Sequence, residues 1–164
     1  MDKKPLEMKL KKFLNNSDKL VILGIGNELR GDDFLGSLLA RRLSKLFKEK
    51  NNIVVIDGGT VPENYTGAIK KENPDNIILI DAADMGKEPG YIRIIEHNEI
   101  ANYHLSTHAM PLSFLVKYLE HSTKADIVLI GIQPKELEFV CNISMEIKKS
   151  MEYLVDIFLK ILIK

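Results

Sequence analysis

Four short, almost wholly apolar runs recur along the 164-residue chain, and helical patterns separate them. They read LVILGI, NIVVID, NIILID and DIVLIGI. Such runs indicate strands buried on both faces, as in a parallel sheet covered by helices. A fifth run, YIRIIE, alternates apolar and polar residues, which is typical of an antiparallel edge strand. The predicted fold is a three-layer α/β/α sandwich, with a mostly parallel sheet of about five strands and one antiparallel edge strand.

The chain is long enough for one domain, predicted over residues 1–164, with 1–18 as an N-terminal helical extension and 19–164 as the main body. Lys plus Arg and Asp plus Glu balance at 23 each, so no overall charge favours nucleic acid or a membrane surface. Neither a signal peptide nor a membrane span is recognisable, which predicts a cytoplasmic protein. The sequence does not determine the oligomeric state, for which a monomer or a weak homodimer is the expectation. The single cysteine, Cys141, excludes an internal disulfide and is expected to be a small buried hydrophobe.

The stretch GIGNELRGDDFLG joins the first predicted strand to a helix and begins like a phosphate-binding loop. Its first two glycines match the start of G-x-G-x-x-G, and Asp57 ends the second strand, where a ribose-binding acid would lie. However, leucine occupies the third glycine position, and two carboxylates open the helix, where they would repel a pyrophosphate. A nucleotide-binding α/β enzyme is therefore a disfavoured alternative.

Polar side chains follow three of the predicted parallel strands. Asn27 and the pair Asp32 and Asp33 follow the first strand, Asp57 ends the second, and Asp81 ends the third. The carboxyl ends of parallel strands meet at one edge of a sheet, where sites form. The acidic pair also suits helix capping, but capping needs only one carboxylate and leaves the other for the strand ends. The charge of Asp81, directly after a buried run, is costly unless it is paired or binds a metal.

Histidine is the remaining ligand type. His97 and His121 are expected at the surface, whereas His104 and His108 lie in the loop ANYHLSTHAMPL, just before a helix. His108 is favoured because Thr107 and the helix-starting Met-Pro pair flank it, and His104 remains its competitor.

The blocks GIGNELRGDDFLG, VVIDGGTVPENY, ILIDAADMGKEPGYIRII, STHAMPLSFLVKYL and IVLIGIQPKELEF together resemble the hydrogenase maturation endopeptidases. They are most similar to the branch that serves hydrogen-evolving, formate-linked hydrogenases and its archaeal relatives. The resemblance covers roughly residues 19–160. Two departures stand out. Phe34 replaces the small glycine that usually follows the acidic pair, which should alter the rim of the site, and residues 1–18 are interpreted as decoration or an oligomer contact.

The resemblance implies an endopeptidase that removes a C-terminal peptide from the nickel-loaded precursor of a [NiFe]-hydrogenase large subunit. It assigns nickel contact to Asp33, Asp81 and His108, and catalysis to the two aspartates. Carboxylate and imidazole suit a divalent first-row metal, and nickel is expected to come with the substrate, with no tightly bound resident cofactor. The sequence leaves open whether a carboxylate or the metal activates water, and hence an aspartic-type or a nickel-dependent subtype. Supporting or capping roles fall to Asn27, Asp32, Asp57 and Thr107.

Two expectations follow from this interpretation. Asp33, Asp81 and His108 should converge on one cleft at the carboxyl edge of the sheet. Asp32→Asn should largely spare processing if Asp32 only caps its helix, because asparagine also caps well. A nickel-binding maturation chaperone without peptidase activity is the other alternative, although the chain has no histidine-rich tract. The sequence does not indicate which hydrogenase is the partner or where its precursor is cleaved.

Overall fold

The computed structural model describes residues 3–105 and 110–163. The first half of the chain contains α1 (Lys3–Phe13), β1 (Leu20–Ile25), η1 (Gly31–Phe34), α2 (Leu35–Leu46), β2 (Ile53–Gly59), η2 (Pro62–Tyr65) and α3 (Thr66–Glu72). The second half contains β3 (Asn76–Asp84), β4 (Ile92–Glu96), η3 (His97–Asn102), β5 (His104–Leu105), α4 (Leu112–Ser122), β6 (Asp126–Ile132) and α5 (Met145–Leu162).

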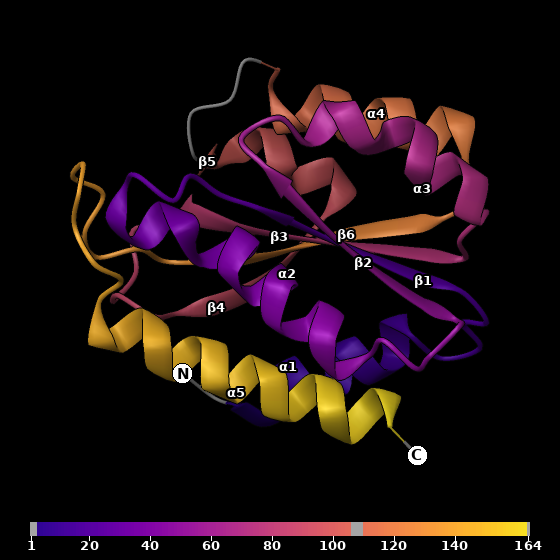
Figure 1. Ribbon diagram of the computed structural model, residues 1–164, viewed down its shortest axis with the longest axis horizontal. Helices are drawn as coiled ribbons and strands as arrows, with labels where there is room; N and C mark the ends of the chain where they lie inside the picture. Colours follow the sequence, from indigo (N-terminus) through magenta and orange to yellow (C-terminus); the bar gives the residue numbers. More distant parts are fainter. Residues whose placement is uncertain (1–2, 106–109, 164) are drawn as a thin grey trace.

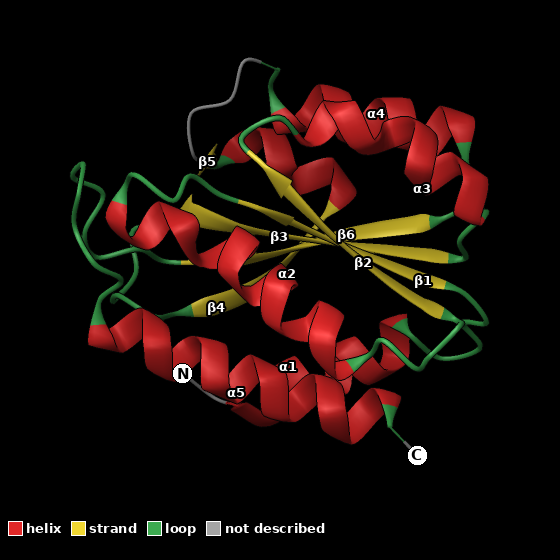
Figure 2. Ribbon diagram, in the orientation of Figure 1, coloured by secondary structure: helices red, strands yellow, loops and turns green. Residues whose placement is uncertain are grey.

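The strands form one sheet in the order β2-β1-β3-β6-β4 (Figure 2). Strands β1, β2, β3 and β6 are parallel, and β4 pairs antiparallel with β6 at the edge. The short β5 pairs antiparallel with the end of β3, at Ala83 and Asp84. The predicted fold class, including the antiparallel edge strand YIRIIE, is confirmed.

Each parallel strand sends alternate side chains to opposite faces of the sheet, and both faces are buried. Ile22 and Ile78 point into a core beneath α1, α2 and α5, whereas Val21 and Ile77 point into a core beneath α3, α4 and η3. Figure 1 shows these two helical layers on either side of the sheet. Burial on both faces explains why the strand sequences are apolar throughout.

The N-terminal helix α1 belongs to the body of the protein. Its Leu6 and Leu10 are buried in the same core as α5, and Glu7 forms an ion pair with Lys160 of α5 at 2.7 Å. Its apolar face is thus covered within the chain, and the interpretation of residues 1–18 as decoration or an oligomer contact stays a hypothesis. Across the described residues, every helix is too short or too polar to cross a membrane.

The strand order places a topological switch point at the carboxyl edge of the sheet, between β1 and β3. From β1 the chain crosses through α2 to β2 on one side, whereas β3 lies on the other side of β1. Where connections leave neighbouring parallel strands in opposite directions, a crevice opens outside the strand ends and commonly holds the active site. An active site is therefore expected at the carboxyl ends of β1 and β3.

Candidate active site

The glycines of the β1–α2 loop allow the chain to pack closely against itself. A Cβ on Gly36 would lie 2.1 Å from the carbonyl oxygen of Ile25 and 2.3 Å from that of Ile80. A Cβ on Gly26 would lie 2.5 Å from the carbonyl oxygen of Asp33. These glycines therefore serve close packing of backbone on backbone. The same packing seats the start of α2 directly on the ends of β1 and β3.

Asp33 and Asp81 both lie near the carboxyl ends of β1 and β3, where such a crevice is expected. Asp33 lies in η1, which packs against β3, and its side chain is buried. Asp81 lies near the end of β3, is fully buried, and its Oδ1 accepts the N–H of Ala82 at 2.9 Å. Two carboxylates thus lie at neighbouring strand ends on one edge of the sheet, as the sequence suggested.

The predicted third ligand, His108, lies outside the described residues, and so does Thr107. Their roles stay predictions. The chain enters this segment from β5, which pairs with β3 at Ala83 and Asp84, immediately beyond Asp81. The described part of the chain before this segment, β5, thus lies beside the strand that carries Asp81.

Asp32 does not cap its own helix. Its carboxylate accepts the backbone N–H groups of Lys135, Glu136 and Ser144 at 2.7–2.9 Å, and the Ser144 hydroxyl at 2.8 Å. Ser144 is the N-cap residue of α5, so Asp32 fastens both the β6–α5 loop and the start of that helix to η1. The expectation of capping is wrong because these partners come from a distant part of the chain.

Asp57 is held at the end of β2 by side chains of α2. Its carboxylate accepts hydrogen bonds from the Ser37 hydroxyl at 2.6 Å, from Arg41 Nε at 2.7 Å and from the Gly59 N–H at 3.1 Å. Burial raises the pKa of Asp57, but these hydrogen bonds outweigh it and leave the pKa below its ordinary value. Asp57 therefore supports the fold beside the crevice as a carboxylate.

Ser37 and Arg41 were missed at the level of sequence. They follow Asp33 at intervals of four residues, the spacing that places side chains on one face of a helix. This spacing, considered together with the strand-end aspartates, is the signal that would have identified Ser37 and Arg41. They link Asp57 to the helix that begins beside Asp33.

Asn27 and Phe34 line a hollow beside the ends of β1 and β2. Asn27 Oδ1 accepts the N–H of Leu29 at 2.9 Å, and its own N–H donates to the Asp33 carbonyl at 3.1 Å. Phe34 helps line a hollow of about 220 Å³, and the Arg41 guanidinium lies 5.1 Å from the centre of its ring. Phe34 thus lines this hollow, and its effect on the rim of the active site stays a prediction.

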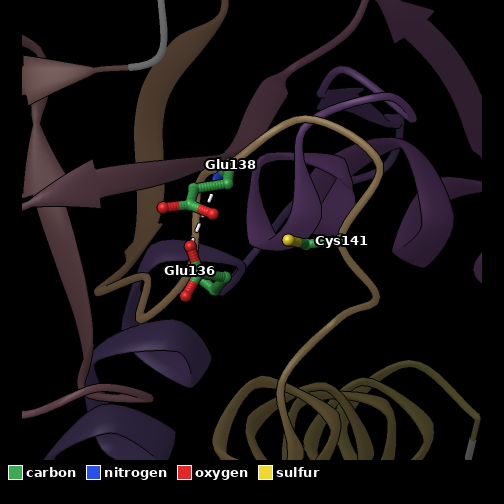
Figure 3. A group of neighbouring side chains, drawn as sticks. All are labelled: Glu136, Glu138 and Cys141. Carbon is green, nitrogen blue, oxygen red and sulfur yellow. Dashed lines mark hydrogen bonds between the residues drawn. The ribbon is translucent and has the colours of Figure 1, made fainter.

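The remaining candidates lie apart from this crevice. His97 pairs with Glu120 at 2.6 Å beside a hollow of about 400 Å³ at the opposite edge of the sheet, near the start of β6. Cys141 is partly exposed, which corrects the expectation of burial. Partial burial and the neighbouring carboxylates of Glu136 and Glu138 raise the pKa of its thiol, which does not suit a nucleophile (Figure 3).

Comparison with known proteins identifies the family. Residues 38–161 match the model of the hydrogenase maturation protease family. The chain belongs to this family. A Methanocaldococcus jannaschii protein assigned to the hydrogenase maturation proteases is 44% identical over 162 residues, 95% of each chain. The hydrogenase 3 maturation protease of Escherichia coli is 40% identical over 133 residues, 80% of this chain and 83% of its own.

A solved structure agrees. The [NiFe] hydrogenase maturation protease HycI from Thermococcus kodakarensis superimposes with a TM-score of 0.87 at 35% identity, covering 95% of this chain and 99% of its own. The resemblance inferred from the sequence blocks is thus confirmed, and the protein is a hydrogenase maturation endopeptidase. Asp32, Asp33 and Asp81 are all buried in this part of the fold.

The hydrogen bonds of Asp57 to Ser37, Arg41 and Gly59 predict how the stability of the fold changes at acid pH. Asp57→Asn should lower the free energy of unfolding at pH 7 by about 1 kcal/mol, because the ionised acceptor of Ser37 and Arg41 is lost. A lowered carboxyl pKa stabilises the fold above the ordinary value of about 3.9 and ceases to do so as the pH falls through the folded-state pKa. Urea unfolding should therefore separate the two proteins at pH 7 and bring them together below about pH 3. A constant gap from pH 7 to pH 2 contradicts this role for Asp57.

Proposed function

We propose that this protease cleaves a C-terminal peptide from a nickel-loaded [NiFe]-hydrogenase large-subunit precursor, and that Asp33 and Asp81 contact the nickel that the precursor carries. The observation that carries the proposal is the pair of buried carboxylates at the adjacent ends of β1 and β3, in a chain of the hydrogenase maturation protease family. The relatives' names support the substrate class: they are maturation proteases of hydrogenase 3 and of a [NiFe] hydrogenase.

The chemistry of the two side chains fits this role. Buried carboxylates are tolerated where they are paired, hydrogen-bonded or bound to a metal, so contact with a metal is compatible with the burial of Asp33 and Asp81. Carboxylate oxygens are reasonable ligands for a divalent first-row metal, and the proposed imidazole of His108 adds a nitrogen ligand. Three protein ligands leave coordination positions open, which the thiolates of the precursor fill. The enzyme thereby recognises a precursor that has already received its metal.

Cleavage then depends on position and on proton transfer. Contact between the nickel and the two carboxylates holds the C-terminal segment of the precursor beside the crevice, so that proximity contributes much of the rate. A carboxylate at this edge also accepts a proton from the water that attacks the scissile carbonyl. The close packing of Gly36, at the start of α2, against the backbone of β1 and β3 keeps the adjoining η1 and its Asp33 in place for both tasks.

A metal-exchange experiment tests the proposal. One mixture contains chelator-stripped enzyme and nickel-loaded precursor, and the other contains nickel-treated enzyme and nickel-free precursor, with cleavage followed by mass spectrometry. Cleavage is expected in the first mixture and not in the second. The reverse result makes the protein a metallopeptidase with its own metal. Tight nickel binding by the isolated enzyme, without cleavage in either mixture, makes it a nickel chaperone.

A further inference from the structure

Exposed apolar side chains gather on two loops at the active-site edge of the sheet. Phe139 and Val140, in the loop between β6 and α5, are 67% and 91% exposed, and Leu29, in the loop after β1, is 59% exposed. The loops touch, because the Val140 N–H donates to the Leu29 carbonyl at 2.8 Å and the Arg30 guanidinium lies 5.8 Å from the ring of Phe139. Leu29, Phe139 and Val140 are called the apolar rim below.

Val140 adopts a backbone conformation that its side chain disfavours. Its φ is +62°, in the left-handed region where β-branched residues are rare. Glycine or asparagine would satisfy the fold at this position with less strain. The chain instead holds a valine there with its side chain almost wholly in solvent. Strain of this kind collects at functional sites, and here it presents an apolar side chain outward.

The loop that carries Phe139 and Val140 is hydrogen-bonded to Asp32 in η1. Asp32 accepts hydrogen bonds from Lys135, Glu136 and Ser144, which lie on both sides of the two apolar residues in the sequence. The Asp32 N–H also donates to the Glu136 carbonyl at 2.7 Å. Because Asp32 directly precedes Asp33, the position of the apolar rim is fixed relative to the catalytic edge. The rim is thus continuous with the proposed substrate site (the loops lie beside the start of α2 in Figure 1).

Negative charge borders the apolar rim. Glu136 and Glu138 lie on the same loop, and each offers a carboxylate oxygen within 4.8 Å of the other and of the Cys141 sulfur (Figure 3). Neither carboxylate takes part in an ion pair with another side chain in the described parts of the chain. Acidic groups this exposed do not by themselves indicate a metal site. They are complementary to a partner that brings a positive charge.

We propose that the apolar rim, with the Glu136 and Glu138 carboxylates beside it, docks a segment of the large-subunit precursor that presents apolar side chains next to a lysine or arginine. This inference rests on the proposed function and adds a recognition surface outside the metal contacts. Docking on the rim aligns the precursor before nickel reaches the carboxylates. The rim therefore contributes to the affinity for the precursor and not to the chemical step.

Kinetics on the full-length enzyme and the nickel-loaded precursor test the inference. The double variant Phe139→Ser, Val140→Gly should raise KM by at least about tenfold and leave kcat within about twofold, because it removes binding energy without touching the reacting groups. Glycine also relieves the strained φ, so the melting temperature should hold or rise. Met8→Ser, at a 60% exposed methionine of α1, is the matched control and should change neither constant. Glu136→Gln combined with Glu138→Gln should weaken the dependence of KM on salt.

The outcomes separate the two proposals. Precursor cleavage by the wild type with an unchanged KM in the apolar double variant rejects the docking surface alone. No cleavage by the wild type rejects the proposed function and the docking surface with it. Sedimentation velocity tests the alternative that a second copy of the chain, and not the precursor, binds the apolar rim. A wild-type dimer at assay concentration that dissociates in the double variant shows that a second copy of the chain covers the rim, and it overturns the inference.

Discussion

Asp33→Asn is expected to slow cleavage of the nickel-loaded precursor by about a thousandfold or more, the scale on which a positioned proton acceptor contributes. Asparagine keeps the shape of the side chain but loses the negative charge and one acceptor oxygen. The free energy of unfolding should stay close to that of the wild type, because asparagine has nearly the size of aspartate and fits the same site. Single-turnover cleavage measured by mass spectrometry gives the rate, and urea unfolding gives the stability.

Glu28→Gln provides the matched control for Asp33→Asn. Glu28 lies in the same loop, and its side chain is 64% exposed, so its substitution removes an equal charge from the neighbourhood of the crevice. The control should leave the rate within about twofold of the wild type, since long-range effects of an exposed charge are screened by salt. A thousandfold loss from both variants means that net charge at this edge matters and that Asp33 has no individual role. A rate within tenfold of the wild type for Asp33→Asn removes it from the reaction.

Asp32→Asn is expected to cost about 3 kcal/mol of unfolding free energy, since a buried donor left without an acceptor costs roughly 1–3 kcal/mol. The amide of asparagine would face at least one of the N–H groups that the carboxylate now accepts, from Lys135, Glu136 and Ser144. Hydrogen exchange should accelerate most in residues 134–144, because these hydrogen bonds fasten that loop. Processing should fall together with stability, in contrast to the behaviour of Asp33→Asn.

Asp126→Asn, at an exposed aspartate at the start of β6, is the control for this second substitution. It should change the free energy of unfolding by no more than about 0.5 kcal/mol. Wild-type stability and unchanged exchange in Asp32→Asn would show that Asp32 is not needed to hold the loop. Processing would then be spared, as a simple helix cap predicts.

The sequence predicted the sheet and the position of the aspartates because both depend on local patterns. Apolar runs bounded by turns identify buried strands. The carboxyl ends of parallel strands lie at one edge of the sheet regardless of the conformation of the loops. Asp33 and Asp81 therefore could be assigned to one edge before any coordinates were known. The role of Asp32 could not, because its partners lie 103–112 residues further along the chain, whereas capping preferences describe only adjacent residues.

Other differences have the same origin in tertiary packing. The α1 sequence showed an amphipathic helix but not what covers its apolar face, which proves to be the core shared with α5. Cys141 belongs to a residue type that is usually buried, yet it lies partly exposed in a loop whose position Asp32 determines. Glycine spacing suggested the start of a phosphate loop, whereas the distances at Gly24 and Gly26 show that those glycines serve close backbone packing.

X-ray absorption at the nickel edge tests most directly whether Asp33 and Asp81 contact the metal of the precursor. Nickel-loaded precursor is mixed with enzyme and frozen within a single turnover, alongside precursor alone and precursor mixed with Asp33→Asn enzyme. Wild-type enzyme should add oxygen or nitrogen ligands at roughly 2.0–2.2 Å, the range of carboxylate and imidazole ligands on zinc, and Asp33→Asn enzyme should add fewer. A nickel spectrum that the wild-type enzyme leaves unchanged, in a sample that goes on to full cleavage, contradicts recognition of the precursor through its metal.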